Sequence, residues 1–299
     1  MEVEPFPVAA NEGRQQDKKF KKEKGLLSDG ATLVSTIYFS QNGNRDHFVN
    51  QIFETFYSQL QKAKKIFIKP NIVSYEPYPT TTHPELLEAV LKRLDGVEVM
   101  VGEAPAIDAG RSNRILEKSP LKDVCNRHDV RLLNLYNEKM KTVRSPRGYK
   151  VKVSTLPLTC DFAISLPVLK IHGMVGLSGA LKNQFGYLSR QDRLLMHCRI
   201  KSINKGIAEV NAVTPTNLFI VDAMETMIKA QECRHGGCPA KLNTMIAGTD
   251  PVSLDLFGLQ LLEKLEPKFG DKKNQALKYI EYASDYGLGT KDFAAKKMQ

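Results

Sequence analysis

Cysteine is scarce in this sequence, and the few cysteines are irregularly spaced. The 299 residues contain Cys125, Cys160, Cys198, Cys233 and Cys238. Because their number is odd and their spacing irregular, we expect reduced thiols rather than a disulfide framework. None of them forms a CxxCxxC run, so we expect no iron–sulfur cluster in this chain.

Long hydrophobic runs are also absent. No stretch approaches the roughly 18 unbroken apolar residues that a membrane-spanning helix needs. The segment MEVEPFPVAANEGRQQ at the N-terminus lacks the basic-then-apolar order of a signal peptide. We therefore expect a soluble, cytoplasmic protein that makes no membrane contact.

Positive charge exceeds negative charge, and part of the excess is concentrated near the start of the sequence. The formal net charge is +10, and RQQDKKFKKEKG at residues 14–25 supplies several of the cations. We expect residues 1–30 to form a basic, disordered and solubilising leader. The alternative is an arm that binds nucleic acid or another anionic surface, although no aromatic interleaving or recognition motif accompanies the charge.

Apolar runs and amphipathic stretches alternate from residue 31 onward, which is typical of β–α–β units. The pattern predicts strands at 32–40, 64–71, 97–105, 130–135, 160–170, 216–224 and 241–250, and helices at 46–61, 83–94, 112–128, 199–213 and 251–265. Residues 136–157 predict an antiparallel hairpin. With 42% apolar residues the chain can bury a substantial core. We predict an α/β fold of two packed Rossmann-like lobes, 31–160 and 161–299, with mostly parallel sheets and a cleft between them.

Polar residues follow the ends of several predicted strands. Ligands of open α/β sheets bind at the carboxyl ends of the strands, where helix N-termini and loop donors gather. Lys69 and Asn71 close the second strand and His83 begins the next helix, so we expect all three to bind a carboxylate or phosphate. Asp222 and Asp250 occupy similar positions and are further candidates. The alternative for His83 is a purely structural helix start, and Asp250 is also a predicted helix cap.

The sharpest signal is KIHGMVGLSGALKNQFG at residues 170–186. Its glycines would let the backbone approach a bound group closely, and we expect a helix to begin near residue 176. We predict His172 and Lys182 as catalytic residues, with Ser178 and Asn183 as binding residues. The alternative is that the histidine lies in the core and the lysine on the surface.

Two further segments contain side chains that bind anions or metals. Arg193 and His197 are four residues apart, so on a helix they share one face, where they would bind an anion or form a plain surface pair. The Cys233–Cys238 loop contains soft donors, but one short loop cannot complete a tetrahedral zinc shell. The alternative for that loop is a mobile, glycine-rich turn.

Five motifs taken together resemble one known family. They are KPNIV followed by THPELLEAV, then VGEAP, LKIHGMVGLSGALKNQFG, DR followed by H, and IAGTDPVSLDLFG. From about Ile66 to about Phe257 the chain is similar to the uncharacterised family of domains of unknown function numbered 362. Members often have an appended ferredoxin-like segment with cluster cysteines, which this sequence lacks.

That family in turn resembles, more distantly, the lactate racemases that use a nickel pincer nucleotide. In those enzymes a histidine, a glycine-rich serine turn and a cofactor-tethering lysine follow one another, as His172, Ser178 and Lys182 do here. The resemblance implies that His172 is an acid/base and that Lys182 anchors a cofactor or substrate. It also implies that His197 is a metal ligand, with Cys198 adjacent, and that the cofactor is a metal or a metal–nucleotide compound.

Three functions are compatible with these residues. The first is an enzyme that binds an anionic small molecule between the lobes through Lys69, Lys182 and Arg193, while His172 and His197 move protons as in a racemase or epimerase. The second is a module that binds an anion or a metal without chemistry. The third is a nucleic-acid-associated protein that uses its basic leader. We favour the enzyme.

Overall fold

Eight strands form one sheet in the computed structural model, which describes residues 34–266 and 269–299. In spatial order they are β12 (Phe293–Lys297), β1 (Ser35–Ser40), β11 (Cys238–Gly248), β10 (Leu218–Ile228), β7 (Phe162–Leu166), β2 (Lys65–Pro70), β3 (Glu98–Glu103) and β4 (Leu132–Asn134). The neighbours from β10 to β4 are parallel, as are β1 and β12, whereas β11 is antiparallel to both of its neighbours. The predicted α/β class with a mostly parallel sheet is confirmed. The predicted leader lies outside the described residues.

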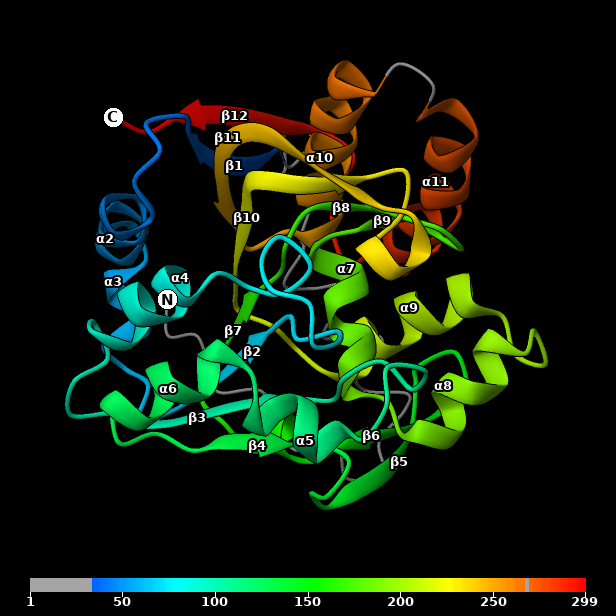
Figure 1. The fold of residues 1–299 in the computed structure, drawn as a ribbon, viewed down its shortest axis with the longest axis horizontal. Helices are drawn as coiled ribbons and strands as arrows, with labels where there is room; N and C mark the ends of the chain where they lie inside the picture. The colour runs from blue at the N-terminus through cyan, green and yellow to red at the C-terminus, as the bar shows by residue number, and fades with distance from the viewer. Residues whose placement is uncertain (1–33, 267–268) are drawn as a thin grey trace, which may run out of the picture.

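Helices cover both faces of this sheet (Figure 1). One face packs against α2 (Arg45–Thr55), α3 (Tyr57–Leu60), α4 (Pro84–Leu91), α5 (Ser112–Glu117) and α6 (Pro120–Arg127). The other face packs against α7 (Ala180–Asn183), α8 (Arg190–His197), α9 (Ile203–Val213), α10 (Pro251–Leu265) and α11 (Gly270–Asp285). Because side chains alternate along a strand, Ile66 and Ile68 of β2 enter the first core and Phe67 the second. No helix in the described ranges is long and apolar enough to cross a bilayer.

Strands from both predicted lobes share the large sheet. Strand β2, from the first lobe, lies between β3 of the same lobe and β7 of the second, and Ile68 is paired with Ile164. Each predicted lobe therefore contributes strands to the same sheet rather than forming a sheet of its own. The parallel order places the carboxyl ends of β2, β3 and β7 along one edge, as expected for a ligand-binding edge.

Two short hairpins form two-stranded sheets that are separate from the large sheet. The first, β5 (Met140–Arg144) with β6 (Lys150–Ser154), is the antiparallel hairpin predicted from the sequence. The second, β8 (Lys170–His172) with β9 (Gly176–Ser178), falls within the glycine-rich segment. Helix α7 therefore begins at Ala180, four residues later than expected, because the residues near 176 form a strand.

Candidate functional site

A cleft of about 600 Å³ opens at the carboxyl ends of β2 and β3. Its walls come from those strand ends, from β8, α7 and α8, and from two short helical turns, Gln184–Tyr187 and Cys233–His235. Cations outnumber carboxylates along these walls. The cationic side chains are Lys69, Lys170, Lys182, Arg193 and Arg199, and the acidic ones are Glu103, Asp108 and Glu232. The cleft therefore suits an anionic ligand.

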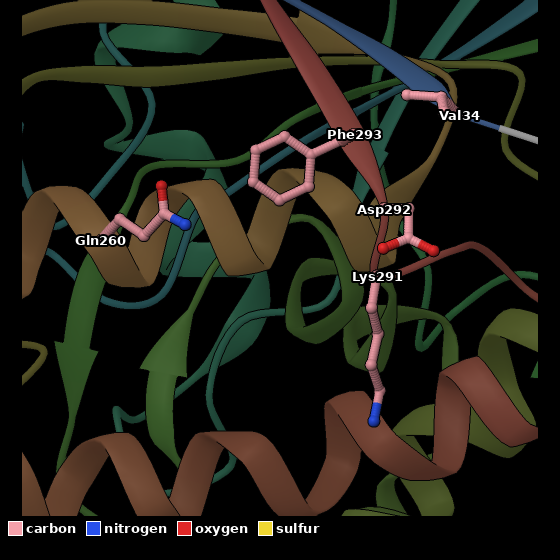
Figure 2. A pocket seen from close by; sticks show the side chains of 5 residues that line it. All are labelled: Val34, Gln260, Lys291, Asp292 and Phe293. Atoms are coloured by element: carbon pink, nitrogen blue, oxygen red, sulfur yellow. The ribbon is translucent and has the colours of Figure 1, made fainter. Parts of the chain in front are cut away.

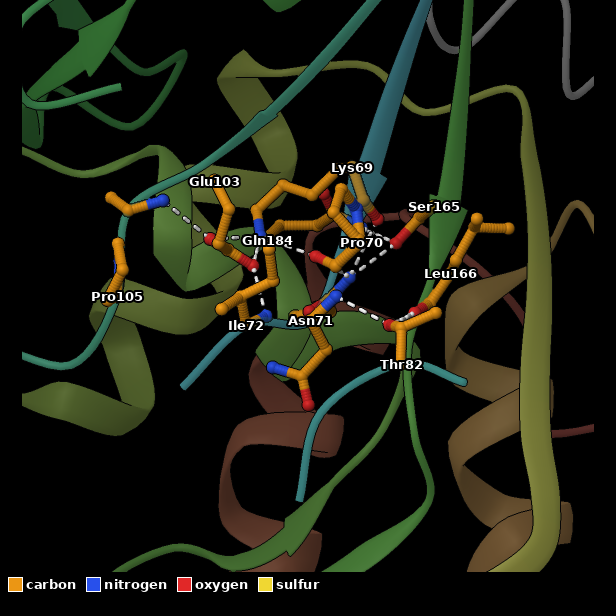
Figure 3. A network of polar contacts seen from close by, with 12 residues as sticks. Lys69, Pro70, Asn71, Ile72, Thr82, Glu103, Pro105, Ser165, Leu166 and Gln184 are labelled. Atoms are coloured by element: carbon orange, nitrogen blue, oxygen red, sulfur yellow. Dashed lines mark hydrogen bonds and ion pairs between the residues drawn. The ribbon is translucent and has the colours of Figure 1, made fainter. Parts of the chain in front are cut away.

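A buried ion pair lies at the base of the cleft (Figure 3). Lys69 is the second-last residue of β2 and Glu103 ends β3, and the Lys69 ammonium lies 2.6 Å from both carboxylate oxygens of Glu103. Glu103 also accepts hydrogen bonds from the backbone N–H groups of Ile72 (3.2 Å) and Ala104 (2.8 Å). Burial lowers the pKa of Lys69, and the Glu103 charge opposes that shift. The charge of Lys69 is thus balanced by Glu103, and its ammonium is fixed in position.

Two glycines of the glycine-rich segment allow close contacts inside the protein. A Cβ on Gly186 would lie 2.3 Å from a Glu103 oxygen and 2.6 Å from the Lys69 ammonium. A Cβ on Gly179 would lie 2.3 Å from Asp255, which accepts hydrogen bonds from the first backbone N–H groups of α7. The expectation that the glycines serve a bound ligand is therefore corrected at these positions, where they make room for buried carboxylates.

Lys170, at the start of β8, is fully buried and has no ion-pair partner in the described part of the chain. Its ammonium donates to the Asn71 side-chain oxygen at 2.8 Å and to the Thr80 carbonyl at 2.5 Å. Burial lowers the pKa of Lys170 to about 8. Both acceptors of this ammonium are neutral oxygens, so its positive charge can attract an anion in the cleft.

Lys182, on α7, differs from the other two lysines. Its ammonium lies 4.4 Å from the centre of the Phe185 ring and, among the described residues, has no hydrogen bond or ion pair. Burial, together with the positive charges of Arg193, Lys170 and Lys69, lowers the pKa of Lys182 to about 7. A bound anion would favour the charged form of this side chain.

Arg193 is held by α8, whose N-terminus is capped by Ser189. One terminal nitrogen donates to the Ala104 carbonyl at 2.7 Å and to the Tyr136 hydroxyl at 2.5 Å. The Arg193 Nε is buried and has no hydrogen-bond partner. Arg193 also lines the cleft, where its guanidinium is suited to bind a carboxylate.

The two cleft histidines have opposite hydrogen-bonding patterns. The Nδ1 atom of His172 accepts from the Met174 N–H at 3.1 Å, so the neutral ring has its proton on Nε2. The Nδ1 atom of His197 lies 2.7 Å from the Arg193 carbonyl and donates to it, which leaves a lone pair on Nε2. Burial lowers the pKa of both rings, and Lys182 is the main charge acting on His172. The first ring is therefore a donor and the second a base.

A family comparison agrees with the motifs noted in the sequence. The profile of a domain of unknown function (DUF362) matches residues 66–260. The chain belongs to this family. The predicted family membership is thereby confirmed. No curated protein matches the sequence.

Two solved structures resemble this DUF362 chain. The lactate racemase apoprotein from Thermoanaerobacterium thermosaccharolyticum has a TM-score of 0.50 and 16% identity, and the match covers 76% of this chain and 57% of that one. A protein from Thermotoga maritima has a TM-score of 0.41 and 16% identity, with coverage of 80% and 59%. The DUF362 chain thus spans less than two thirds of the length of either protein. The likeness to the racemase shows a shared fold.

Most of the residues predicted for the site line the cleft of the DUF362 chain. These are Lys69, Asn71, His172, Ser178, Lys182, Asn183, Arg193 and His197. As predicted, Arg193 and His197 share one face of a helix. Cys198 is exposed at the end of α8 and does not line the cleft.

Three other predicted residues lie away from the cleft. His83 caps α4 by accepting from the Glu85 N–H, whereas Asp222 is buried and paired with Arg45 at 2.7 Å. Asp250 caps α10, as its alternative prediction stated, by accepting from backbone N–H groups of that helix. Because β11 is antiparallel to β10, Asp250 lies at the edge of the sheet opposite the cleft.

A metal held by protein side chains alone does not fit the DUF362 site. Across residues 34–266 and 269–299, no group of three or more His, Cys, Asp or Glu side chains is arranged to hold a metal ion. In the Cys233–Cys238 loop, His235 lies 3.4 Å from Glu232 and 3.5 Å from Asp108, and these contacts are ion-pair geometry. We therefore derive no step through a metal. The cations of the cleft would suit the phosphate of a nucleotide as well as a carboxylate.

A second hollow lies at the far edge of the sheet, beside β12 (Figure 2). It is lined by Val34, Gln260, Lys291, Asp292 and Phe293. Both of its charged side chains belong to exposed residues. No buried acid, base or nucleophile is among the residues that line this hollow.

Sequence reasoning did not select three important residues of the cleft. The sequence places Glu103 and Lys170 at the ends of predicted strands, where ligands of open α/β sheets bind, but neither was assigned a role in the site. Phe185 is buried between Lys182, Arg193 and His197, and an aromatic residue in a glycine-rich segment is usually part of the core. The rule that ligands bind at the carboxyl ends of parallel strands, which was used for Lys69, applies equally to Glu103, because Glu103 ends the neighbouring parallel strand.

Proposed function

We propose that this protein binds a small carboxylate in the cleft and transfers a proton at the adjacent carbon, as a racemase or epimerase does. The observation that supports this most directly is the Nε2 lone pair of His197 in a cleft with excess positive charge. Removing a proton next to a carboxylate places more negative charge on a group that is already anionic. Nearby cations stabilise that charge, so they lower the barrier.

The hydrogen-bonding patterns suggest separate roles for three side chains. His197 is the proton acceptor, because its Nδ1–H is bound to a carbonyl and its Nε2 is free. Lys182, whose pKa is about 7, is the proton donor when it is charged. The His172 Nε2–H is a hydrogen-bond donor to a substrate oxygen, which revises the acid/base role expected from the sequence. Arg193 and Lys170 hold the carboxylate.

The first test is solvent exchange at the carbon next to the carboxylate. L-Lactate, L-malate and L-alanine would be incubated with the protein in deuterium oxide, and deuterium incorporation followed by NMR. We expect incorporation into at least one of them, and a loss of at least about 100-fold in His197→Gln, which is the scale of acid–base catalysis. The same variant should retain its affinity for the carboxylate. Absence of exchange with all three acids, while they bind, would contradict the catalytic proposal.

The excess of cleft cations also supports a second candidate, an anion-binding module without chemistry. In that case carboxylates bind, the carbon-bound protons do not exchange, and His197→Gln has no effect. Loss of Arg193 would still weaken binding, since its guanidinium lines the cleft and is suited to a carboxylate. The nucleic-acid role stays a prediction, because it depends on the leader.

A further inference from the structure

Three groups of the cleft surround one aromatic ring. Phe185 is buried in the short turn after α7, and its ring centre lies 4.4 Å from the Lys182 ammonium. The Arg193 guanidinium carbon is 5.6 Å from the same centre, and the His197 ring centre is 5.8 Å away in an edge-on arrangement. An amine, a guanidinium and an imidazole base are thus grouped at one point of the cleft.

Lys182 is the reactive member of this group. The two neighbouring lysines are occupied, since Lys69 is bound to Glu103 and Lys170 donates to Asn71 and to a carbonyl. Lys182 has no such partner in the described residues, and a hydrophobic ring replaces water on one side. A desolvated lysine beside another cation is the usual environment of an imine-forming lysine.

We propose that the free amine of Lys182 forms a reversible imine with a 2-oxocarboxylate bound in the cleft. This inference depends on the proposed anion-binding function, because the carboxylate must be held beside the amine. Arg193 lines the cleft, and its Nε has no hydrogen-bond partner. A guanidinium is the side-chain group best suited to bind a carboxylate. The carbonyl carbon, one bond from the carboxylate, then lies next to the Lys182 amine.

The chemistry balances with groups that line the cleft. The Lys182 lone pair attacks the carbonyl carbon, one C–N bond forms, and the carbonyl electron pair moves to oxygen. His197 Nε2 accepts the proton released by nitrogen and returns it to that oxygen, which gives a carbinolamine. The nitrogen lone pair then expels the hydroxyl group, which takes the remaining nitrogen proton through His197 and leaves as water, and the neutral imine is formed. The overall change is amine plus ketone to imine plus water, with no oxidant or reductant.

The protonation state of the amine is favourable near neutral pH. Burial and the Arg193 charge lower the pKa of Lys182 to about 7, so about half of the side chains are unprotonated at pH 7. An ordinary lysine is almost entirely protonated there. The cleft therefore provides both a nucleophile and the cation that holds its target.

Borohydride trapping tests the inference directly. The full chain would be incubated with pyruvate, reduced with cyanoborohydride and examined by intact mass and peptide mapping. We expect one reduced pyruvate adduct per chain, located on Lys182. The labelled fraction should fall at least about tenfold in Lys182→Arg, which keeps the positive charge but cannot form an imine. Lys118→Arg, an exchange at an exposed site, should label like the wild type.

Further arms separate failure of the imine from failure of the cleft. Acetone lacks the carboxylate and should label at least about tenfold less than pyruvate at equal concentration. Arg193→Lys should need more pyruvate for the same labelling. If pyruvate binds calorimetrically but leaves no adduct, the imine is refuted and the anion-binding cleft stands. If pyruvate does not bind, both fail. Adducts on several surface lysines, or equal labelling of Lys182→Arg, would also refute the inference.

Discussion

Anion binding in the cleft should take up a proton at Lys182. Burial and neighbouring cations lower the pKa of this side chain to about 7, and a bound carboxylate would raise it again. The charged form, which attracts the anion, therefore predominates below pH 7 and is lost as the pH rises through 7. We expect carboxylate affinity to fall by up to about tenfold for each pH unit above 7.

Other groups of the cleft titrate in different ranges. The pKa values of His172 and His197 are lowered from a range that is already below 7, so neither ring changes charge above pH 7. Lys170, with a pKa of about 8, extends the loss of affinity to higher pH. Between pH 7 and pH 8, Lys182 is therefore the main source of the effect.

Calorimetry with L-lactate, a carboxylate that has no carbonyl carbon for Lys182 to attack, measures the affinity and the proton uptake in two buffers of different ionisation enthalpy. The apparent binding enthalpy should differ between the buffers by an amount that corresponds to uptake of up to one proton. Lys182→Met keeps an unbranched side chain, one atom shorter, without the charge, so the affinity of this variant should be weaker at pH 7 and less dependent on pH. An affinity that is constant from pH 6 to pH 9, or an equal pH dependence in Lys182→Met, would refute the reasoning.

Three further predictions concern stability. Glu103→Gln should lower the free energy of unfolding by about 3–5 kcal/mol in guanidinium denaturation, because Lys69 stays buried without its counter-charge; a loss below about 1 kcal/mol would contradict this. Gly186→Ala should cost about 1–3 kcal/mol because its Cβ would lie 2.3 Å from Glu103, whereas Gly270→Ala, with no atom within 4 Å of the added Cβ, should be near neutral. Burial raises the pKa of Asp255 to about 7, so the stability it contributes is complete below its unfolded pKa and is lost as the pH rises through 7. The unfolding free energy of Asp255→Asn, relative to the wild type, should therefore increase from about pH 5 to about pH 8, and a constant difference would contradict that assignment.

The parts of the fold that depend on local signals could be predicted from the sequence. Helix α10 begins at Pro251 with Asp250 as its cap, as the Asp-Pro pair indicates. The position of Lys69 beside the cleft follows from a buried apolar strand that ends in Lys-Pro. Both signals involve residues that are adjacent in the chain, so no knowledge of the tertiary structure was needed.

Features that depend on distant pairing could not be predicted in the same way. Asp222 resembled a strand end, but β10 continues to Ile228 beside β11, so Asp222 lies within the strand and binds Arg45. The sequence pattern did not indicate α11 or β12, and β12 is defined by its pairing with β1, as in Ser35 with Phe293. Direction and order of strands depend on contacts between segments far apart in sequence, which local patterns do not specify.

The continuous sheet also determines how a ligand can enter and leave. In many two-lobed proteins the lobes rotate about a hinge, and the rate of opening controls release. Here β2 and β7, which come from different halves of the chain, are hydrogen-bonded neighbours directly beneath the cleft. A hinge motion between the halves would have to break that ladder. The loop at 104–108 and the turn at 231–235 also contribute residues to the lining of the cleft, and these segments can change the shape of the cleft without breaking the sheet.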